Sequence, residues 1–258
     1  MKSSRMPALF VGHGSPMNAI QDNPHTRAWQ QIGAGIARPN AILMVSAHWY
    51  TNGTGVTAMR EPRTIHDFYG FPPELFAIRY PAPGAPELAQ RVQALLRPVT
   101  VTEDHEWGLD HGTWSVLVRM FPRADIPVVQ LSIDATQPPD FHYRLGRQLA
   151  ALRDEGVMLM GSGNVVHNLR LLNWDSSGEG PTWATAFNDR IRNAVASGDH
   201  QLAINYETDE AARLSVPTPE HYLPLLYVLG ASGGEPATFP TDGIELGSIS
   251  MLSVLFEG

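Results

Sequence analysis

Residues 41–50 read AILMVSAHWY, and this stretch decides the expected fold class. Its first six residues are apolar or small and do not alternate with polar ones, which is typical of a strand covered on both faces. Similar short apolar runs occur elsewhere in the chain, and each leads into a glycine-containing or polar segment. They lie at residues 8–11, 128–133 and 157–160.

Stretches with apolar residues at helical spacing lie between and after these runs, at residues 86–96, 141–153, 183–196 and 209–214. Alternating strand and helix patterns predict a three-layer α/β/α sandwich. Half-buried patterns at residues 55–59 and 99–102 predict further strands, with an edge of the sheet as their expected place. A length of 258 residues is compatible with one catalytic domain over residues 1–258, which is the organisation we expect.

The composition excludes several classes of function. The formal net charge is -8, from 18 Lys and Arg against 26 Asp and Glu, so no cationic surplus exists for nucleic acid or an anionic membrane. We find no signal peptide and no apolar run long enough to span a bilayer, which predicts a cytoplasmic protein. The chain has no cysteine, so any metal must be bound by histidines and carboxylates.

Three of the 10 histidines stand at or beyond the ends of predicted strands. His13 lies in GHGSP, His48 in SAHWY, and His167 closes GSGNVVH. Ligands bind beyond the carboxyl ends of strands in open α/β sheets, so these imidazoles are expected to converge on one ion. The alternative for each is a structural histidine, bonded to the backbone in a turn or in the core. We expect the glycine-rich segment 161–163 to form a loop.

Three further histidines lie in loops. His111 belongs to DHGTW, whose glycine allows exposure, and His66 lies in the aromatic, proline-rich segment 60–84, where it can line a pocket. In PTPEHY, Glu220 and His221 stand near the start of a probable helix, and either side chain can be a ligand. The remaining histidines have polar neighbours and are expected on the surface: His25, His105, His142 and His200.

Other chemistries have no support in the motifs. The G-x-S-x-G nucleophile elbow and the H-E-x-x-H zinc motif are both absent from the sequence. The residues alone therefore predict a mononuclear metal site with histidine ligands, and one or two further histidines for proton transfer.

The motifs taken together resemble one known family. In chain order they are MPALFVGHGSPMN, SAHWYTNGTGVTAM, IHDFYGFPPELF, YPAPG, WGLDHGTWSVL, VVQLSID, GSGNVVHNLR and PTPEHYLPLLYVLG. This set resembles the LigB-type class III extradiol ring-cleaving dioxygenases, and within them the 4,5-DOPA extradiol dioxygenase group, as a bacterial member. The resemblance implies a LigB-like sandwich around a central mixed sheet.

The resemblance also implies metal ligands. His13 and His48 match the first two ligands of the family, and His221 matches a further ligand of the DOPA group. His167 matches a position that acts as acid or base in protocatechuate-cleaving relatives but counts as a metal ligand in the DOPA group. Since those relatives use a carboxylate as third ligand, Glu220 is an additional candidate.

The other site residues follow in the same way. We expect His167 and His111 to be catalytic through proton transfer, and His111 and His66 to contact the substrate. A histidine with a pKa near 6.5 can deprotonate a catechol and later return the proton.

The expected activity is insertion of both atoms of O₂ into a catechol such as L-DOPA, with 4,5-cleavage to a muconic semialdehyde. One divalent metal per chain is implied, Fe(II) for activity, although Zn²⁺ binds the same donors and can occupy the site. The catechol and O₂ are the expected partners, with no obligatory protein partner. A zinc hydrolase that uses the same histidines is the alternative, and a non-catalytic protein that binds a metal or an aromatic ligand is a third hypothesis.

Overall fold

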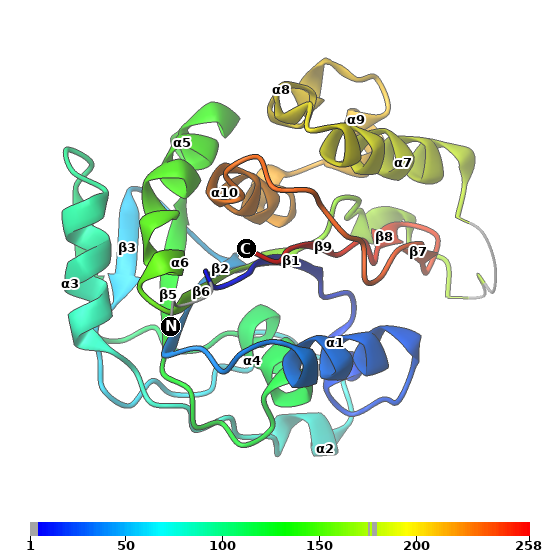
Figure 1. Cartoon of the computed structure of the whole chain (residues 1–258). Helices are drawn as coiled ribbons and strands as arrows, with labels where there is room; N and C mark the ends of the chain where they lie inside the picture. Colours follow the sequence, from blue (N-terminus) through cyan, green and yellow to red (C-terminus); the bar gives the residue numbers. More distant parts are fainter. Residues whose placement is uncertain (1–4, 175, 177–179) are drawn as a thin grey trace.

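The computed structural model describes residues 5–174, 176 and 180–258, and a mixed sheet lies at its centre (Figure 1). Its strands are β1 (Ala8–Gly12), β2 (Ala41–Thr51), β3 (Thr54–Thr57), β4 (Val101–Asp104), β5 (Val128–Asp134), β6 (Val157–Gly163) and β9 (Val254–Phe256). They are ordered β4-β3-β5-β2-β6-β1-β9. The central strands β5, β2, β6 and β1 run parallel, whereas β3 is antiparallel to β5 and β9 is antiparallel to β1. The predicted mixed sheet is confirmed.

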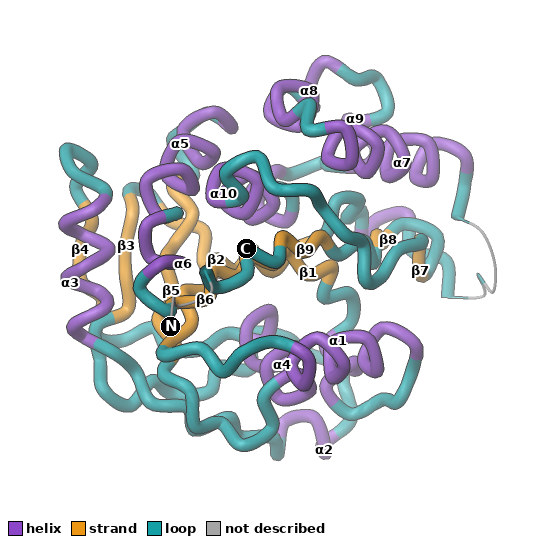
Figure 2. The backbone as a smooth tube through the Cα atoms, in the orientation of Figure 1, coloured by secondary structure: helices purple, strands orange, loops and turns teal. Residues whose placement is uncertain are grey.

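Helices cover the two faces of this sheet, as Figure 2 shows for α1 and α4 on one side and α10 on the other. The α-helices are α1 (Pro24–Gly35), α2 (Pro73–Phe76), α3 (Pro86–Leu95), α4 (His111–Met120), α5 (Pro139–Leu149), α6 (Ala151–Asp154), α7 (Thr182–Ser197), α8 (His200–Ile204), α9 (Ala212–Ser215) and α10 (Leu223–Ala231). Four short 3₁₀ helices are η1 (Pro16–Ala19), η2 (Leu169–Leu171), η3 (Tyr206–Thr208) and η4 (Pro219–His221), and β7 (Ile244–Glu245) pairs with β8 (Ile249–Ser250) among the described residues. None of the described helices has the length and apolar character needed to cross a bilayer.

The strand β2 shows why the apolar runs are continuous. Leu43 and Val45 belong to the hydrophobic cluster on one face of the sheet, and Ile42 and Met44 belong to the cluster on the other. A strand with both faces covered is apolar in a nearly continuous run instead of alternating with polar residues. The predicted three-layer α/β/α arrangement is therefore confirmed.

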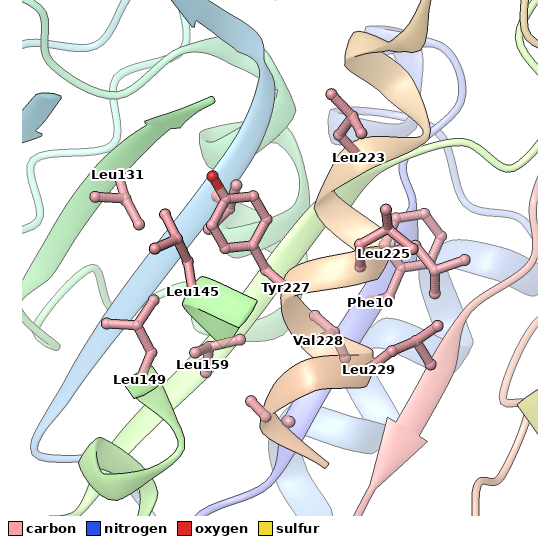
Figure 3. Packing of buried hydrophobic residues seen from close by; sticks show 14 of the residues in the cluster. Phe10, Leu131, Leu145, Leu149, Leu159, Leu223, Leu225, Tyr227, Val228 and Leu229 are labelled. Carbon is pink, nitrogen blue, oxygen red and sulfur yellow. The ribbon is translucent and has the colours of Figure 1, made fainter. Parts of the chain in front are cut away.

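Helix α10 is apolar on all sides because it is enclosed on all sides. Every residue from Leu223 to Ala231 is buried, and the helix packs between α5 and the strands β1 and β6 (Figure 3). A fully buried Leu or Val side chain contributes about 1.5–3 kcal/mol relative to an exposed one. The short helix η4 directly precedes α10 and contacts β2 and β6 itself.

Two predicted boundaries are wrong in an informative way. The segment 161–163, expected as a loop, is the end of β6, where Gly161 pairs with Phe10 and Gly163 with Gly12. A Cβ at Gly161 or Gly163 would collide with the backbone of Pro224 or His221, so these glycines permit η4 and α10 to pack directly on the strand. The glycine-rich composition of this segment suggested a loop. The structure shows instead that Gly161 and Gly163 make room for the backbone of η4 and α10.

The second difference is the length of β2, which continues past the predicted end at residue 46 as far as Thr51. Its register against β5 shifts between Val45 and Tyr50, and His48 lies in this irregular stretch. Such irregularities re-aim side chains at functional sites. His48 therefore lies within a strand rather than after one.

The predicted helices at 86–96 and 183–196 are confirmed as α3 and α7. The periodic segment 141–153 divides into α5 and α6, and the segment 209–214 contributes only part of the short helix α9. Both predicted additional strands exist, but only β4 lies at the edge, because β3 is placed between β4 and β5.

Candidate metal centre

Five histidine side chains from distant parts of the chain meet at the carboxyl ends of the parallel strands. His13 follows β1, His48 lies near the end of β2, His167 follows β6, His111 begins α4 and His221 ends η4. Three of these rings form a nearly regular triangle. The ring centroids of His13 and His48 are 5.2 Å apart, those of His13 and His221 5.5 Å, and those of His48 and His221 5.1 Å.

His111 and His167 flank this triangle at shorter distances. The centroid of His111 lies 3.9 Å from that of His48, and His111, His13 and His48 each offer a nitrogen within 4.8 Å of the others. His167 stacks face to face on His221, with centroids 3.4 Å apart and 7° between the ring planes. His167, His221 and Glu220 form a second group of donors within 4.8 Å.

Hydrogen-bond directions determine which nitrogen of His13 carries a proton. The Ser162 hydroxyl donates to the carbonyl oxygen of Gly112 at 2.6 Å, because a carbonyl can only accept. The hydroxyl has no second proton, so it must accept from Nδ1 of His13, which lies 2.9 Å away. His13 therefore has its proton on Nδ1 and a lone pair on Nε2.

Carboxylates face the Nδ1 atoms of the neighbouring rings. Nδ1 of His48 lies 3.3 Å from Oδ2 of Asp67, and Nδ1 of His111 lies 2.9 Å from Oδ1 of the same residue. Nδ1 of His221 lies 3.2 Å from Oε1 of Glu220. An ionised carboxylate can only accept, so these contacts favour a proton on each Nδ1 and leave Nε2 available to a metal. Of these three contacts, only that of His221 with Glu220 has hydrogen-bond geometry, and Nδ1 of His111 is close to Asp67 without being aligned for a hydrogen bond.

This arrangement fits a divalent ion of the kind that imidazoles bind. Nε2 of His13 lies 3.3 Å from Nε2 of His48, and if both rings carry their proton on Nδ1, a cation is needed between these two nitrogens. Two imidazole nitrogens on one tetrahedral ion at about 2.1 Å are roughly 3.4 Å apart, and their ring centroids roughly 5 Å apart. The nitrogens of His13 and His48 and the ring centroids of His13, His48 and His221 have this spacing. By donor atoms within 4.8 Å of one another, His111 also groups with His13 and His48.

Burial keeps the imidazoles neutral, which is the form that binds metals. It lowers the pKa of His13 and of His221 well below the ordinary value, and the neighbouring histidines lower both further. Burial and His111 lower the pKa of His48 to about 3, against the opposing influence of Asp67. Burial, together with His111, lowers the pKa of His167 to about 4.

His66 is not among the five clustered imidazoles. Its Nε2–H donates to the carbonyl of Ile78 at 3.1 Å, and its ring packs against Phe68 and Trp114. Phe68 in turn meets His111 edge to face, with centroids 5.4 Å apart. His66 thus lies one aromatic ring away from the cluster.

Two expectations about exposure are wrong. His111 is 6% exposed and starts a helix whose N-cap is Asp110, so it does not belong to an open loop. His142 was expected on the surface, but it is 0% exposed and its Nδ1 lies 3.0 Å from the hydroxyl of Tyr227. His142 lies on the buried side of the amphipathic helix α5, together with Leu145 and Leu149. The helical spacing therefore predicts its burial, whereas its polar neighbours in the sequence do not.

The other three surface expectations hold to different degrees. His105 is exposed, as expected. His25 is half-buried beside Glu245, and His200 is half-buried beside Tyr143.

Sequence reasoning missed Asp67 and Ser162. Asp67 directly follows His66 in the motif IHDFYG, but only His66 was expected to have a role in the site. Ser162 lies between two glycines in a segment interpreted as a loop. Alternation along the strand β6 would have placed Ser162 on the opposite face from its neighbours, but only once the strand itself was recognised.

Comparison with known proteins places the chain among proteins of similar sequence throughout its length. The family model for the catalytic LigB subunit of aromatic ring-opening dioxygenase matches residues 3–257. A protein of Escherichia coli (strain K12) named 4,5-DOPA dioxygenase extradiol is 59% identical over 260 residues, which cover 98% of this chain and 96% of the relative. A protein of Beta vulgaris with the same name is 41% identical over 87% of this chain and 86% of its own length.

The fold is also found among solved structures. A crystal structure of an uncharacterized protein from Escherichia coli K12 superposes with a TM-score of 0.87 and 54% sequence identity. The match covers 98% of this chain and 100% of that one.

Proposed function

This chain belongs to the LigB family of aromatic ring-opening dioxygenases, and from this premise we propose that its substrate is a catechol of the DOPA class. The enzyme is an extradiol dioxygenase, an oxidoreductase whose substrates are a catechol and O₂. DOPA is the substrate named for the relatives described above, and 4,5-cleavage to a muconic semialdehyde is the corresponding reaction. The zinc hydrolase alternative has no support among these relatives.

We propose that one divalent metal is bound by Nε2 of His13, His48 and His221. The observation that carries this assignment is the 3.3 Å distance between Nε2 of His13 and Nε2 of His48 within the triangle of rings. When bound, the metal supplies adjacent positions for the catechol oxygens and O₂. Fe(II) is the proposed active ion, and Zn²⁺ is expected to compete for the same nitrogens.

The stacked pair of rings separates the roles of His167 and His221. An imidazole lone pair lies in the plane of its ring, so two parallel rings 3.4 Å apart cannot both direct their lone pairs at one ion. We assign His221 to the metal because of its place in the triangle. His167 is then the group that we propose to accept a proton from the catechol, because it is not a ligand and stays unprotonated at pH 7. Burial lowers its pKa to about 4, below the value near 6.5 that was expected, so it is a weaker base than an exposed histidine.

His111 and the aromatic segment beside it form the proposed wall for the substrate. His111 is in contact with Phe68, and Phe68 and His66 belong to a group of rings that includes Trp114. Aromatic side chains in this arrangement favour packing of a planar ring. We propose that His111 exchanges protons with the bound catechol and that His66 orients the substrate through this group.

We also propose that residues 1–258 form one catalytic domain. Both hydrophobic clusters pack against the same central sheet, and the site draws its residues from β1 to η4. The cytoplasmic location stays a prediction from the sequence.

The activity is tested by loading the protein anaerobically with Fe(II) and measuring O₂ uptake with L-DOPA and with caffeate. We expect uptake together with a yellow semialdehyde, and no uptake by the Zn²⁺-loaded protein. Hydrolysis that persists without O₂ would instead support the zinc hydrolase. An iron-loaded protein that consumes no O₂ with any catechol would refute the proposal.

The metal assignment has its own test. His13→Ala and His48→Ala each remove one ligand and are expected to bind no stoichiometric metal, as measured by elemental analysis of the purified proteins. His105→Ala, at an exposed position, is the matched control. Wild-type metal content in both ligand variants would overturn the assignment.

A further inference from the structure

Asp67 is a single carboxylate that faces two imidazoles of the cluster. Oδ2 lies 3.3 Å from Nδ1 of His48, and Oδ1 lies 2.9 Å from Nδ1 of His111. Oδ1 also accepts the main-chain N–H of His111 at 2.9 Å. The side chains are mostly enclosed, with exposed fractions of 19% for Asp67, 18% for His48 and 8% for His111.

The backbone just before Asp67 is bonded to the segment that carries His111. Ile65 donates its N–H to the carbonyl of Leu109 at 2.7 Å and accepts from Nε1–H of Trp114 at 2.7 Å. Thr64 and Leu109 form a parallel β-bridge. These contacts hold the carboxylate in place between His48 and His111, although it lies in an otherwise irregular part of the chain.

We propose that Asp67 is a positioning residue that holds His48 and His111 in the tautomer with the proton on Nδ1 and the lone pair on Nε2. This inference rests on the proposed metal centre. A carboxylate can accept from both rings at once, with one oxygen facing each ring. Outer partners of this kind orient metal-binding imidazoles and raise their basicity.

The substitution Asp67→Asn gives a specific expectation, because an amide has one acceptor and one donor. Oδ1 accepts the main-chain N–H of His111 and lies 2.9 Å from its Nδ1, so the amide oxygen should stay there and the NH₂ should turn to His48. Nδ1 of His48 must then accept, and the proton of His48 moves to Nε2. That proton would point at Nε2 of His13, 3.3 Å away, and occupy the lone pairs that the metal needs.

The experiment uses the full chain without metal and Zn²⁺ alone as the probe. We expect Asp67→Asn to weaken Zn²⁺ binding by about 10–100-fold in competition with a chromophoric chelator. In ¹⁵N spectra of the imidazoles, His48 should change from the Nδ1–H to the Nε2–H tautomer while His111 keeps its own. Asp22→Asn makes the same chemical change at an exposed ion pair with Arg27 and should alter neither quantity.

The outcomes are distinguishable. If the wild-type protein binds no divalent metal, the proposed centre fails, and the inference fails with it. If the wild type binds Zn²⁺ and Asp67→Asn binds it equally well with unchanged tautomers, only the role of Asp67 is refuted. The spectrum of the wild type is a test that needs no variant, because an Nε2–H tautomer on His48 or His111 would contradict the proposal directly.

Discussion

At the scale of single residues, Ser162 shows how a small polar side chain can determine metal binding. Its hydroxyl connects Nδ1 of His13 to the carbonyl of Gly112. In Ser162→Ala the ring of His13 loses the acceptor that fixes its tautomer, so Zn²⁺ affinity should fall by about 10–100-fold. Chelator competition measures this.

The matched control is Ser115→Ala in α4, where the buried hydroxyl has no hydrogen-bond partner within the part of the chain that the structure describes. That variant should bind Zn²⁺ like the wild type. Equal affinities for both alanine variants would show that the hydrogen bond to His13 does not matter for the metal.

The sequence allowed the five histidines and Glu220 to be identified, but not Asp67 and Ser162. His13, His48 and His167 stand out because each lies at or near the end of an apolar run, where parallel strands bring side chains together. Asp67 and Ser162 pair with rings far away in the sequence. The contact between Ser162 and His13 spans 149 residues, and no local pattern encodes a pairing that exists only after strands β1 and β6 align.

At the scale of elements, Gly163 and Gly146 each allow a neighbouring helix to pack closely, but only Gly163 lies against the residue His221 of the site. A Cβ at Gly163 in β6 would overlap the carbonyl oxygen of His221, and one at Gly146 in α5 would overlap that of Tyr227 in α10. Each Gly→Ala substitution should cost about 1–3 kcal/mol of unfolding free energy through overpacking. Only Gly163→Ala should also weaken Zn²⁺ binding, because it displaces η4 and the imidazole of His221.

Chemical denaturation and Zn²⁺ titration of the two variants separate these effects. Gly146→Ala is the control for destabilisation without damage to the site. If Gly163→Ala is destabilised but keeps wild-type Zn²⁺ affinity, then the packing of η4 on β6 does not position His221.

The elements that could be predicted from the sequence are those defined by local patterns. Covered strands and the helices α3 and α7 follow from apolar runs and periodicity, which are local properties. The end of β6 and the irregular stretch of β2 do not, because each is shaped by another element: η4 and α10 pack on β6, and β2 shifts register against β5. Composition alone cannot distinguish a glycine that turns the chain from one that admits a neighbour.

At the scale of the whole molecule, the layer order was predictable and the strand order was not. Continuous apolar strands require helices on both faces, which gives three layers. The order β4-β3-β5-β2-β6-β1-β9 depends on which strands pair, and the antiparallel entry of β9 beside β1 leaves no mark in the short sequence of β9. The family resemblance, rather than periodicity, predicted that the sheet is mixed.

The buried histidines should make the metal-free fold sensitive to acid. Burial lowers the pKa of His142 to about 4, whereas an unfolded chain has the ordinary value of about 6.5. The unfolded state therefore binds a proton more readily than the folded state between these values. The stability that neutral His142 contributes is fully present above pH 6.5 and is lost as the pH falls toward 4, by up to about 3 kcal/mol.

His142→Gln isolates this contribution, because Gln keeps a polar group near Tyr227 but does not titrate. Urea unfolding of the chelator-treated proteins from pH 7 to pH 4 should show the wild type losing more stability than the variant. The clustered histidines, including His48 and His167, titrate in both proteins and cancel in the difference. His105→Gln, at an exposed side chain, is the control. Parallel stability curves for the wild type and His142→Gln would mean that His142 is already protonated in the fold or reaches solvent, contrary to its burial.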